Sequence, residues 1–141
     1  MSKRKNSSAS GAAHEREAQR VLHSLGYRRI HRAIRTPVFR GGRYFSNDND
    51  VLGVFDLEAH APSKLPRYVQ VTVEEKTGAR KTKVEPVAAD MSTDNVQVEV
   101  WGWVGGRRKA GVQAQGFRVH RWGGILAGWS EVAFLEKVAD A

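Results

Sequence analysis

The first regular pattern along the chain is an apolar stripe at helical spacing. Four residues at positions i, i+3, i+4 and i+7 share one side of such a helix: Ala18, Val21, Leu22 and Leu25. Ser10 suits the N-cap position, and Gly26 follows the stripe, where glycine often ends a helix. The pattern predicts a helix over residues 11–25, in which Glu15 lies near the edge of the stripe and leans towards the packed side.

Strict alternation of apolar and polar residues, which predicts strands, begins further along the chain. The run YVQVTVE sets three valines on one side of a strand and Gln70, Thr72 and Glu74 on the other. The run NVQVEVWGWV alternates in the same way, and β-branched or apolar residues enrich three further stretches. We expect strands at about residues 28–36, 51–59, 67–75, 95–104 and 112–122.

The segments between these strands carry weaker signals. Residues 40–50, RGGRYFSNDND, read as a long loop, and residues 77–94 leave room for one short helix. The glycine-flanked GGRRKAG stretch predicts the basic tip of a β-hairpin. Residues 1–10 read as a disordered basic tail, and residues 11–141 as one domain closed by a short strand and a short helix. This order of elements predicts an α+β or α/β domain with a mixed sheet.

Composition restricts the classes of function. The 141 residues fit a single domain, and the absence of cysteine excludes disulfide frameworks, thiolate zinc sites and cysteine nucleophiles. No apolar run approaches the roughly 20 residues that span a bilayer, and no apolar segment follows the basic N-terminus as in a secretory signal. We therefore expect a cytoplasmic protein without a membrane partner.

Charge points to a polyanionic partner. The net charge is +8 and the isoelectric point is about 10.2, and nucleic acid is the commonest partner of such a surface. The positive residues form three clusters instead of a single tail. The candidate DNA-binding residues are Arg28, Arg29, Arg32 and Arg35, then Arg80 and Lys81, then Arg107, Arg108 and Lys109.

One group of residues suggests chemistry. Asp56 lies in an apolar run, and carboxylates are seldom buried without a partner or a metal. An antiparallel hairpin would bring Asp56 opposite Gln70 or Thr72, and Glu15 could complete the group from the helix. Carboxylate and amide oxygens form the hard donor set that Mg²⁺ or Mn²⁺ prefers. The alternative is that the polar face belongs to a half-solvated sheet and binds nothing.

The arrangement resembles the PD-(D/E)xK nuclease superfamily, and within it the archaeal-type Holliday junction resolvases. The similarity runs from GAAHEREAQRVLHSLGY through RRIHRAIRT and FDLEA to YVQVT. On these motifs Glu15 matches the glutamate of the first helix and Asp56 the aspartate of the D-[IL]-x-A strand. The resemblance implies a restriction-endonuclease-like domain, a Mg²⁺- or Mn²⁺-dependent endonuclease acting on DNA, with branched DNA as one candidate substrate, and a homodimer.

The chain departs from this family at the next motif. Gln70-Val71-Thr72 stands where the family has Glu-x-Lys, so an amide replaces the metal-binding glutamate and a hydroxyl replaces the lysine. DVLGVFDLEA…YVQVT is similar to a D-x-x-G-x-x-D…QVT variant found in phage-like and bacterial nuclease-like proteins. Candidates for the missing positive charge are Lys76, Arg80 and Lys81, and Glu74-x-Lys76 restores the pattern two positions further on, on the same strand face.

Three hypotheses remain open from the sequence. The first is a metal-dependent DNA endonuclease with Glu15, Asp56, Gln70, Thr72 and Lys76 in its active site and the first three as metal ligands. The second is a catalytically inactive relative that binds DNA or a protein, for which the Gln-x-Thr replacement is the best evidence. The third is an unrelated nucleic-acid-binding module with a solvated sheet face.

Overall fold

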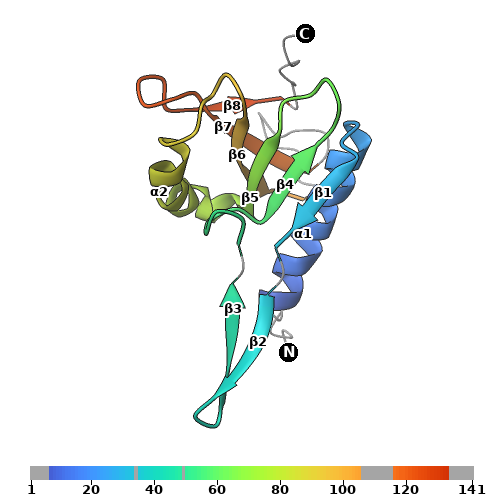
Figure 1. The fold of residues 1–141 in the computed structure, drawn as a ribbon, viewed down its shortest axis with the longest axis vertical. Coiled ribbons are helices and arrows are strands. Elements are labelled where there is room, and N and C mark those ends of the chain that lie inside the picture. Colours follow the sequence, from blue (N-terminus) through green and yellow to red (C-terminus); the bar gives the residue numbers. More distant parts are fainter. Residues whose placement is uncertain (1–6, 34, 49, 106–115, 134–141) are drawn as a thin grey trace.

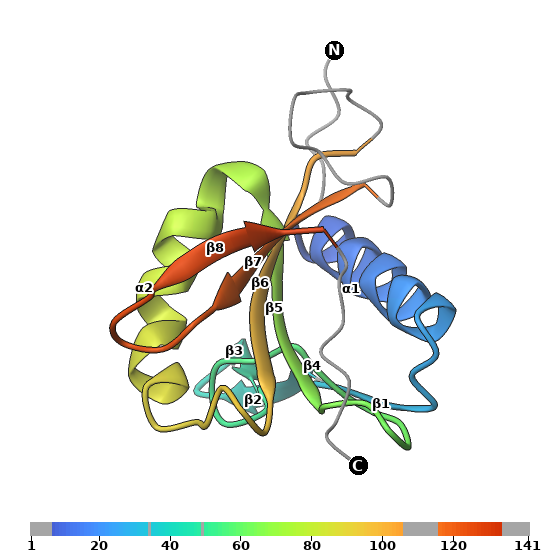
Figure 2. The same cartoon turned by 90° about the horizontal axis from the view of Figure 1, so that it is seen from above.

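The computed structural model describes residues 7–33, 35–48, 50–105 and 116–133. A six-stranded mixed sheet has the strand order β1-β4-β5-β6-β7-β8 and forms the middle layer. The bounds of its strands are β1 Arg29–Arg32, β4 Leu57–His60, β5 Arg67–Val73, β6 Gln97–Trp103, β7 Phe117–Trp122 and β8 Trp129–Val132. Figure 2 shows one helix on each face of this sheet, which confirms the expected α+β class.

The position of one helix along the chain explains why the sheet is mixed. Helix α1 (Ser7–Ser24) packs on β1, β4 and β5, and α2 (Thr77–Ala88) packs on β5 and β6. The short helix η1 (Glu74–Lys76) and α2 connect β5 to β6, which pair in parallel, while the other neighbouring strands pair antiparallel. A parallel pair needs a crossover of this kind.

Two apolar clusters fill the space between the layers. Under α1 the core contains Ala18, Val21, Leu22, Leu57, Val69, Val71, Trp101 and Phe117. Under α2 it contains Val54, Phe55, Val84, Ala88, Val98, Val100 and Trp122. Successive residues of a strand point to opposite faces, so Val69 and Val71 face α1 while Gln70 and Thr72 face the α2 layer. The predicted alternation of β5 is therefore confirmed.

Several boundaries differ from the expectations. Helix α1 already includes Ser7, so Ser10 is not its N-cap, and Gly26 ends it with a φ of +98°. The predicted loop at residues 40–50 is wrong for most of its length, because Arg43–Asp48 form strand β3. The predicted basic tip at 105–111 lies almost wholly outside the described residues.

Strand β3 pairs with β2 (Arg35–Arg40) in a two-stranded sheet of its own, the β2–β3 arm. Figure 1 shows this arm projecting from the body of the molecule.

No helix in the described part of the chain has the length and apolar character that a membrane-spanning helix needs.

Gly102 allows the start of the crossover to lie directly on the sheet. A Cβ atom at this position would lie 2.7 Å from Cγ2 of Thr77 and 3.1 Å from the Cα of Glu74. Both distances are too short, and the second contact is with backbone, which cannot rotate away. The absent side chain therefore determines how closely η1 and α2 approach β6.

We expect Gly102→Ala to lower the free energy of unfolding by about 1–3 kcal/mol, the usual cost of overpacking a core. Gly78→Ala is the matched control, because nothing lies within 4 Å of a Cβ there and the residue is inside α2. It should raise stability by about 0.5–1 kcal/mol through helix propensity. Urea denaturation measures both, and equal effects of the two substitutions would contradict the steric account.

Candidate functional site

Asp56 and Gln70 form a buried polar pair on the α2 face of the sheet. Asp56 is 3% exposed and directly precedes β4, where its backbone N–H donates to the carbonyl of Val69 at 2.9 Å. Its Oδ2 accepts hydrogen bonds from Nε2 of Gln70 at 2.6 Å and from the backbone N–H of Val71 at 2.7 Å. The expected contact between Asp56 and Gln70 is therefore present, and both of these donors are neutral.

The orientation of the Gln70 amide leaves an oxygen available. Nε2 donates to Asp56 and, at 3.3 Å, to the carbonyl of Val71, so the amide carbonyl points the other way. Within the described residues this Oε1 is buried and accepts no hydrogen bond. Buried polar atoms are nearly always paired, and an unpaired one beside a carboxylate suits a ligand that needs oxygen donors.

A tight turn brings a second aspartate to the same place. Val51 and Phe55 form an antiparallel bridge with N–H···O distances of 2.8 and 2.9 Å, and Asp50 and Asp56 are the residues directly outside it. Oδ1 of Asp50 is buried and, among the described residues, has no hydrogen-bond partner. Asp50 is also the first position of the D-x-x-G-x-x-D pattern in DVLGVFD.

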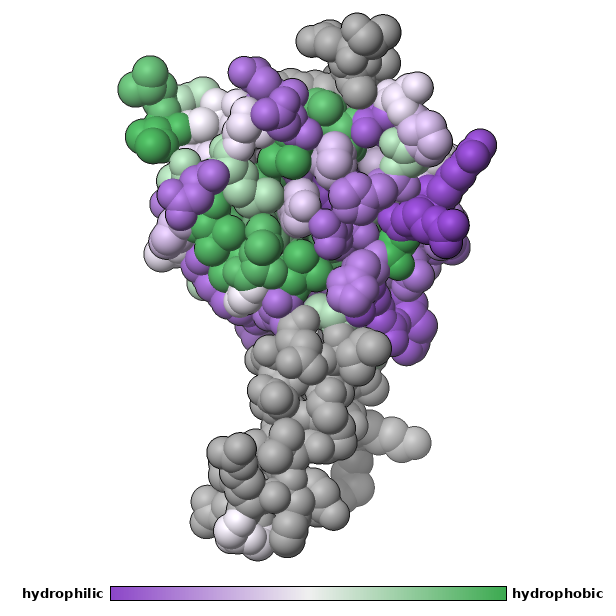
Figure 3. Space-filling view, viewed as in Figure 1, coloured by the Kyte–Doolittle hydropathy of each residue, from purple (hydrophilic) through white to green (hydrophobic). Residues whose placement is uncertain are grey.

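The turn between the two aspartates is conformationally strained. Leu52 has a φ of +53° and Gly53 a φ of +77°, and a non-glycine residue seldom adopts the left-handed region. Leu52 is also 58% exposed. Strained backbone next to exposed apolar surface is characteristic of functional loops. Figure 3 shows apolar surface gathered on the α2 side of the body, whereas the side with α1 and β1 is mainly hydrophilic.

A lysine that the sequence did not indicate supplies positive charge here. Nζ of Lys83, on α2, lies 3.7 Å from Oδ2 of Asp50, and its side chain is 41% exposed. Lys76, the candidate chosen from the Glu74-x-Lys76 pattern, is exposed in η1 because strand β5 ends at Val73. The expectation that Glu74 and Lys76 share the strand face is therefore wrong. Glu74 instead forms an ion pair with Arg118.

The other two predicted site residues, Thr72 and Glu15, lie on opposite sides of the sheet. Thr72 is 8% exposed and points from β5 to the same face as Gln70, two residues further along. Glu15 belongs to α1, which packs on the opposite face of the sheet. In the described part of the chain no three histidine, aspartate or glutamate side chains are grouped to hold a metal ion. The candidate oxygen donors are thus Asp56, the Gln70 amide beside it, and Asp50 from across the Val51–Phe55 bridge.

A second polar group lies beside this pair on the same sheet face. Tyr68 donates a hydrogen bond to Oε1 of Glu58 at 2.8 Å, and Nε2 of His60 lies 3.0 Å from the same oxygen. Burial acts to raise the pKa of Glu58, but the hydrogen bonds from His60 and Tyr68 outweigh it and the net shift is downward. Burial, reinforced by the bond to Glu58, raises the pKa of Tyr68 to about 12. Glu58 is therefore an anion that is fixed by Tyr68 and His60, and it is not a free surface residue.

The predicted DNA-binding residues are spread over several elements. Arg28 and Arg29 are exposed at the start of edge strand β1, and Arg32 is half-buried at its end. Lys81 lies 6.0 Å from the ring centre of Trp129, and burial lowers the pKa of its ammonium group. Arg80 is half-buried on α2. Arg107, Arg108 and Lys109 lie outside the described residues.

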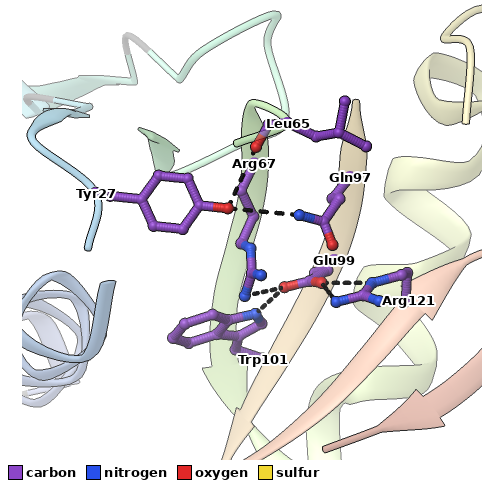
Figure 4. Close-up of polar contacts among 7 residues, drawn as sticks. All are labelled: Tyr27, Leu65, Arg67, Gln97, Glu99, Trp101 and Arg121. Atoms are coloured by element: carbon purple, nitrogen blue, oxygen red, sulfur yellow. Dashed lines mark hydrogen bonds and ion pairs between the residues drawn. The ribbon is translucent and has the colours of Figure 1, made fainter. Parts of the chain in front are cut away.

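A buried charge cluster on the α1 face is separate from this site (Figure 4). Glu99 is fully buried between two arginines, with Oε1 3.3 Å from Nη1 of Arg67 and Oε2 2.7 Å from Nη2 of Arg121. Nε1 of Trp101 donates to Oε1 at 2.8 Å. The Arg67 guanidinium is also completely buried and lies 5.3 Å from the ring centre of Tyr27. This cluster links three neighbouring strands, because Arg67 belongs to β5, Glu99 to β6 and Arg121 to β7.

No protein-family model, curated protein or solved structure matches the chain. The geometry of the Asp50–Asp56–Gln70 group and its surroundings therefore carries the functional argument.

Proposed function

We propose that the chain is a Mg²⁺- or Mn²⁺-dependent DNA endonuclease whose active site is built on Asp50, Asp56 and Gln70. The observation that carries the proposal is the unpaired, buried Oε1 of Gln70 beside the fixed carboxylate of Asp56. The unpaired Oδ1 of Asp50, one residue outside the Val51–Phe55 bridge, supports the same donor set. Three oxygen ligands with two negative charges suit a hard divalent cation.

The residues of the chain have distinct roles in this proposal. Asp50, Asp56 and Gln70 would hold the cation, which when bound polarises a phosphate oxygen and lowers the pKa of a water molecule. The hydrogen bonds from Gln70 and Val71 fix the rotamer of Asp56 before any ligand arrives. Lys83 provides the positive charge that offsets developing negative charge on the phosphate group.

The competing proposal is an inactive relative that binds DNA or a protein. The specific observation in its favour is that Gln70-Val71-Thr72 lacks both the glutamate and the lysine of the resembled motif. Lys83 answers half of this objection, because this lysine of α2 lies 3.7 Å from the carboxylate of Asp50. Because Gln70 is neutral, the site has one negative charge fewer than a site with three carboxylates. We therefore expect it to bind a cation more weakly than such a site does.

The deciding experiment is a cleavage assay on a panel of duplex, single-stranded, flap and four-way DNAs. We expect shortened products with Mg²⁺ or Mn²⁺ and none with EDTA. The four-way substrate tests the branched-DNA specificity implied by the resemblance. Two results together would refute the nuclease: DNA that stays intact in every lane, and a wild-type protein that binds Mn²⁺ no more tightly than Asp56→Asn does. Only the inactive, DNA- or protein-binding relative would then remain.

Lys83→Met should reduce the cleavage rate about 100-fold or more, since one electrostatic stabiliser of a transition state typically contributes that much. DNA binding should change by less than threefold, because only one charge is lost from the surface. Lys76→Met is the matched control and should cleave at close to the wild-type rate. Rates are measured under single-turnover conditions, and a large loss with Lys76→Met alone would transfer the role to η1.

A further inference from the structure

The β2–β3 arm begins and ends at the proposed active site. Its first strand follows Ala33, whose N–H donates to the carbonyl of Asp56 at 2.8 Å, and its second strand leads into Asp50. The paired register runs from Arg35↔Asp48 to Arg40↔Arg43, six residues in each strand. At about 3.3 Å per residue the arm is roughly 20 Å long. The base of the arm is therefore next to Asp56, and its tip lies roughly 20 Å further out.

The tip of the arm combines a minimal turn with two like charges. Gly41 and Gly42 have φ values of +57° and +78°, the pattern of a two-residue type I′ turn. The turn places Arg40 and Arg43 in directly opposite positions. Like charges at opposite positions destabilise an antiparallel pair, and a bound anion removes that cost.

The arm and the strand before it hold most of the excess charge of the protein. Residues 28–48 contain six arginines and one aspartate, a net charge of +5 within a total of +8. The arginines are Arg28, Arg29, Arg32, Arg35, Arg40 and Arg43. This concentration beside the proposed active site points to a polyanion as the partner.

We propose that the β2–β3 arm binds duplex DNA by entering its major groove and contacting phosphates with the Arg40–Arg43 tip. The proposal deepens the proposed nuclease function and rests on it for the choice of DNA. The major groove of B-form DNA admits a two-stranded β-ribbon, and the arm is such a ribbon. Pro37 lies in the middle of β2 and has no N–H to donate, which disfavours the addition of a strand from another protein.

The test compares two double variants that each remove two arginines. Arg40→Ala/Arg43→Ala alters the tip, and Arg16→Ala/Arg20→Ala alters two exposed positions on α1. Fluorescence anisotropy measures binding to a labelled 30-base-pair duplex in EDTA at 50–200 mM KCl, and circular dichroism checks the fold. The tip variant should bind roughly 10- to 60-fold more weakly at 0.1 M salt, and its log K against log salt slope should flatten by about 1.8. The α1 variant should stay within threefold of the wild type.

Three results would overturn the arm proposal. One is an equal loss of affinity in both variants, which would indicate a general charge effect. Another is a single-stranded oligonucleotide that competes as well as the duplex does for the wild type. The third is a tip variant that becomes monomeric in sedimentation from a dimeric wild type while binding DNA normally.

The failure of the arm proposal and that of the nuclease proposal are distinguishable, because binding is measured without metal. A wild type that binds duplex through the tip but never cleaves refutes only the nuclease. A tip variant that binds DNA normally while the wild type cleaves refutes only the arm.

Discussion

Asp56→Asn is expected to abolish metal-dependent DNA cleavage and to leave DNA binding intact or tighter. The carboxylate at this position is 3% exposed and is oriented by Gln70 and by the N–H of Val71, so it is the best-fixed oxygen donor of the site. An asparagine keeps the shape but loses the charge that binds a divalent cation. Losing several kcal/mol of metal-assisted stabilisation corresponds to a rate loss of about 10³-fold or more.

The unchanged or tighter binding has an electrostatic cause. Without its cation, an aspartate repels the phosphates that it helps to cleave, whereas an amide of the same size does not. Binding is measured with EDTA, cleavage with Mn²⁺, and the fold by circular dichroism. Cleavage by Asp56→Asn at the wild-type rate would remove Asp56 from the active site.

Gln70→Glu provides the opposite change at the neighbouring ligand. It places a second carboxylate against Asp56, where the amide now donates at 2.6 Å, so the metal-free protein should lose stability through like-charge repulsion. Mn²⁺ should restore that stability, because a ligand that binds only the folded state stabilises it by mass action. A thermal melt that Mn²⁺ shifts no further in Gln70→Glu than in the wild type would argue against a cation at this site.

Glu99→Gln should destabilise the fold more than any surface substitution. The glutamate is fully buried between Arg67 and Arg121, and its neutralisation leaves the fully buried guanidinium of Arg67 and the partly exposed one of Arg121 without this anion. Breaking a buried ion pair in this way costs about 3–5 kcal/mol. For a chain of this size we expect the melting temperature to fall by roughly 10–17 °C.

The control for Glu99 is Glu17→Gln, which removes an ion pair with Arg20 on the exposed side of α1. An exposed pair of this kind contributes less than about 1 kcal/mol. A combined Arg67→Met/Glu99→Leu/Arg121→Met variant should recover much of the loss, since apolar groups can replace a buried ionic cluster. Urea denaturation compares the four proteins, and equal values for Glu99→Gln and Glu17→Gln would refute the assignment.

The local sequence pattern was sufficient to predict a helix or strand wherever one face of that element is apolar. The stripe of Ala18, Val21 and Leu22 predicted α1, and the alternation around Gln70 predicted both β5 and the side on which its polar residues lie. The contact of Asp56 with Gln70 followed from those two facts and from a short hairpin. Spacing along the chain determines such features, because side-chain direction in a helix or strand repeats with a fixed period.

Only the tertiary structure decided which residues reach the site from other elements. Lys83 reaches Asp50 because α2 crosses the sheet, and the ending of β5 at Val73 removes Lys76 from the strand face. Glu15 belongs to the helix on the opposite face, although its position on the stripe was predicted. Distances between separate elements depend on packing angles and crossover paths, which local spacing does not contain.

The same distinction applies to two misread stretches. Gly41-Gly42 indicates a hairpin turn by itself, but the glycine, asparagine and aspartate residues of RGGRYFSNDND favour a loop when this stretch is read alone. The alternation of β6 predicted a polar face at Glu99, whereas in the fold this carboxylate is completely buried between two arginines. The sequence by itself therefore determined which elements form and which way most side chains point. The tertiary structure alone decided whether each face lies against water, against an opposite charge or against another layer. Burial depends on contacts between segments that are distant in the sequence.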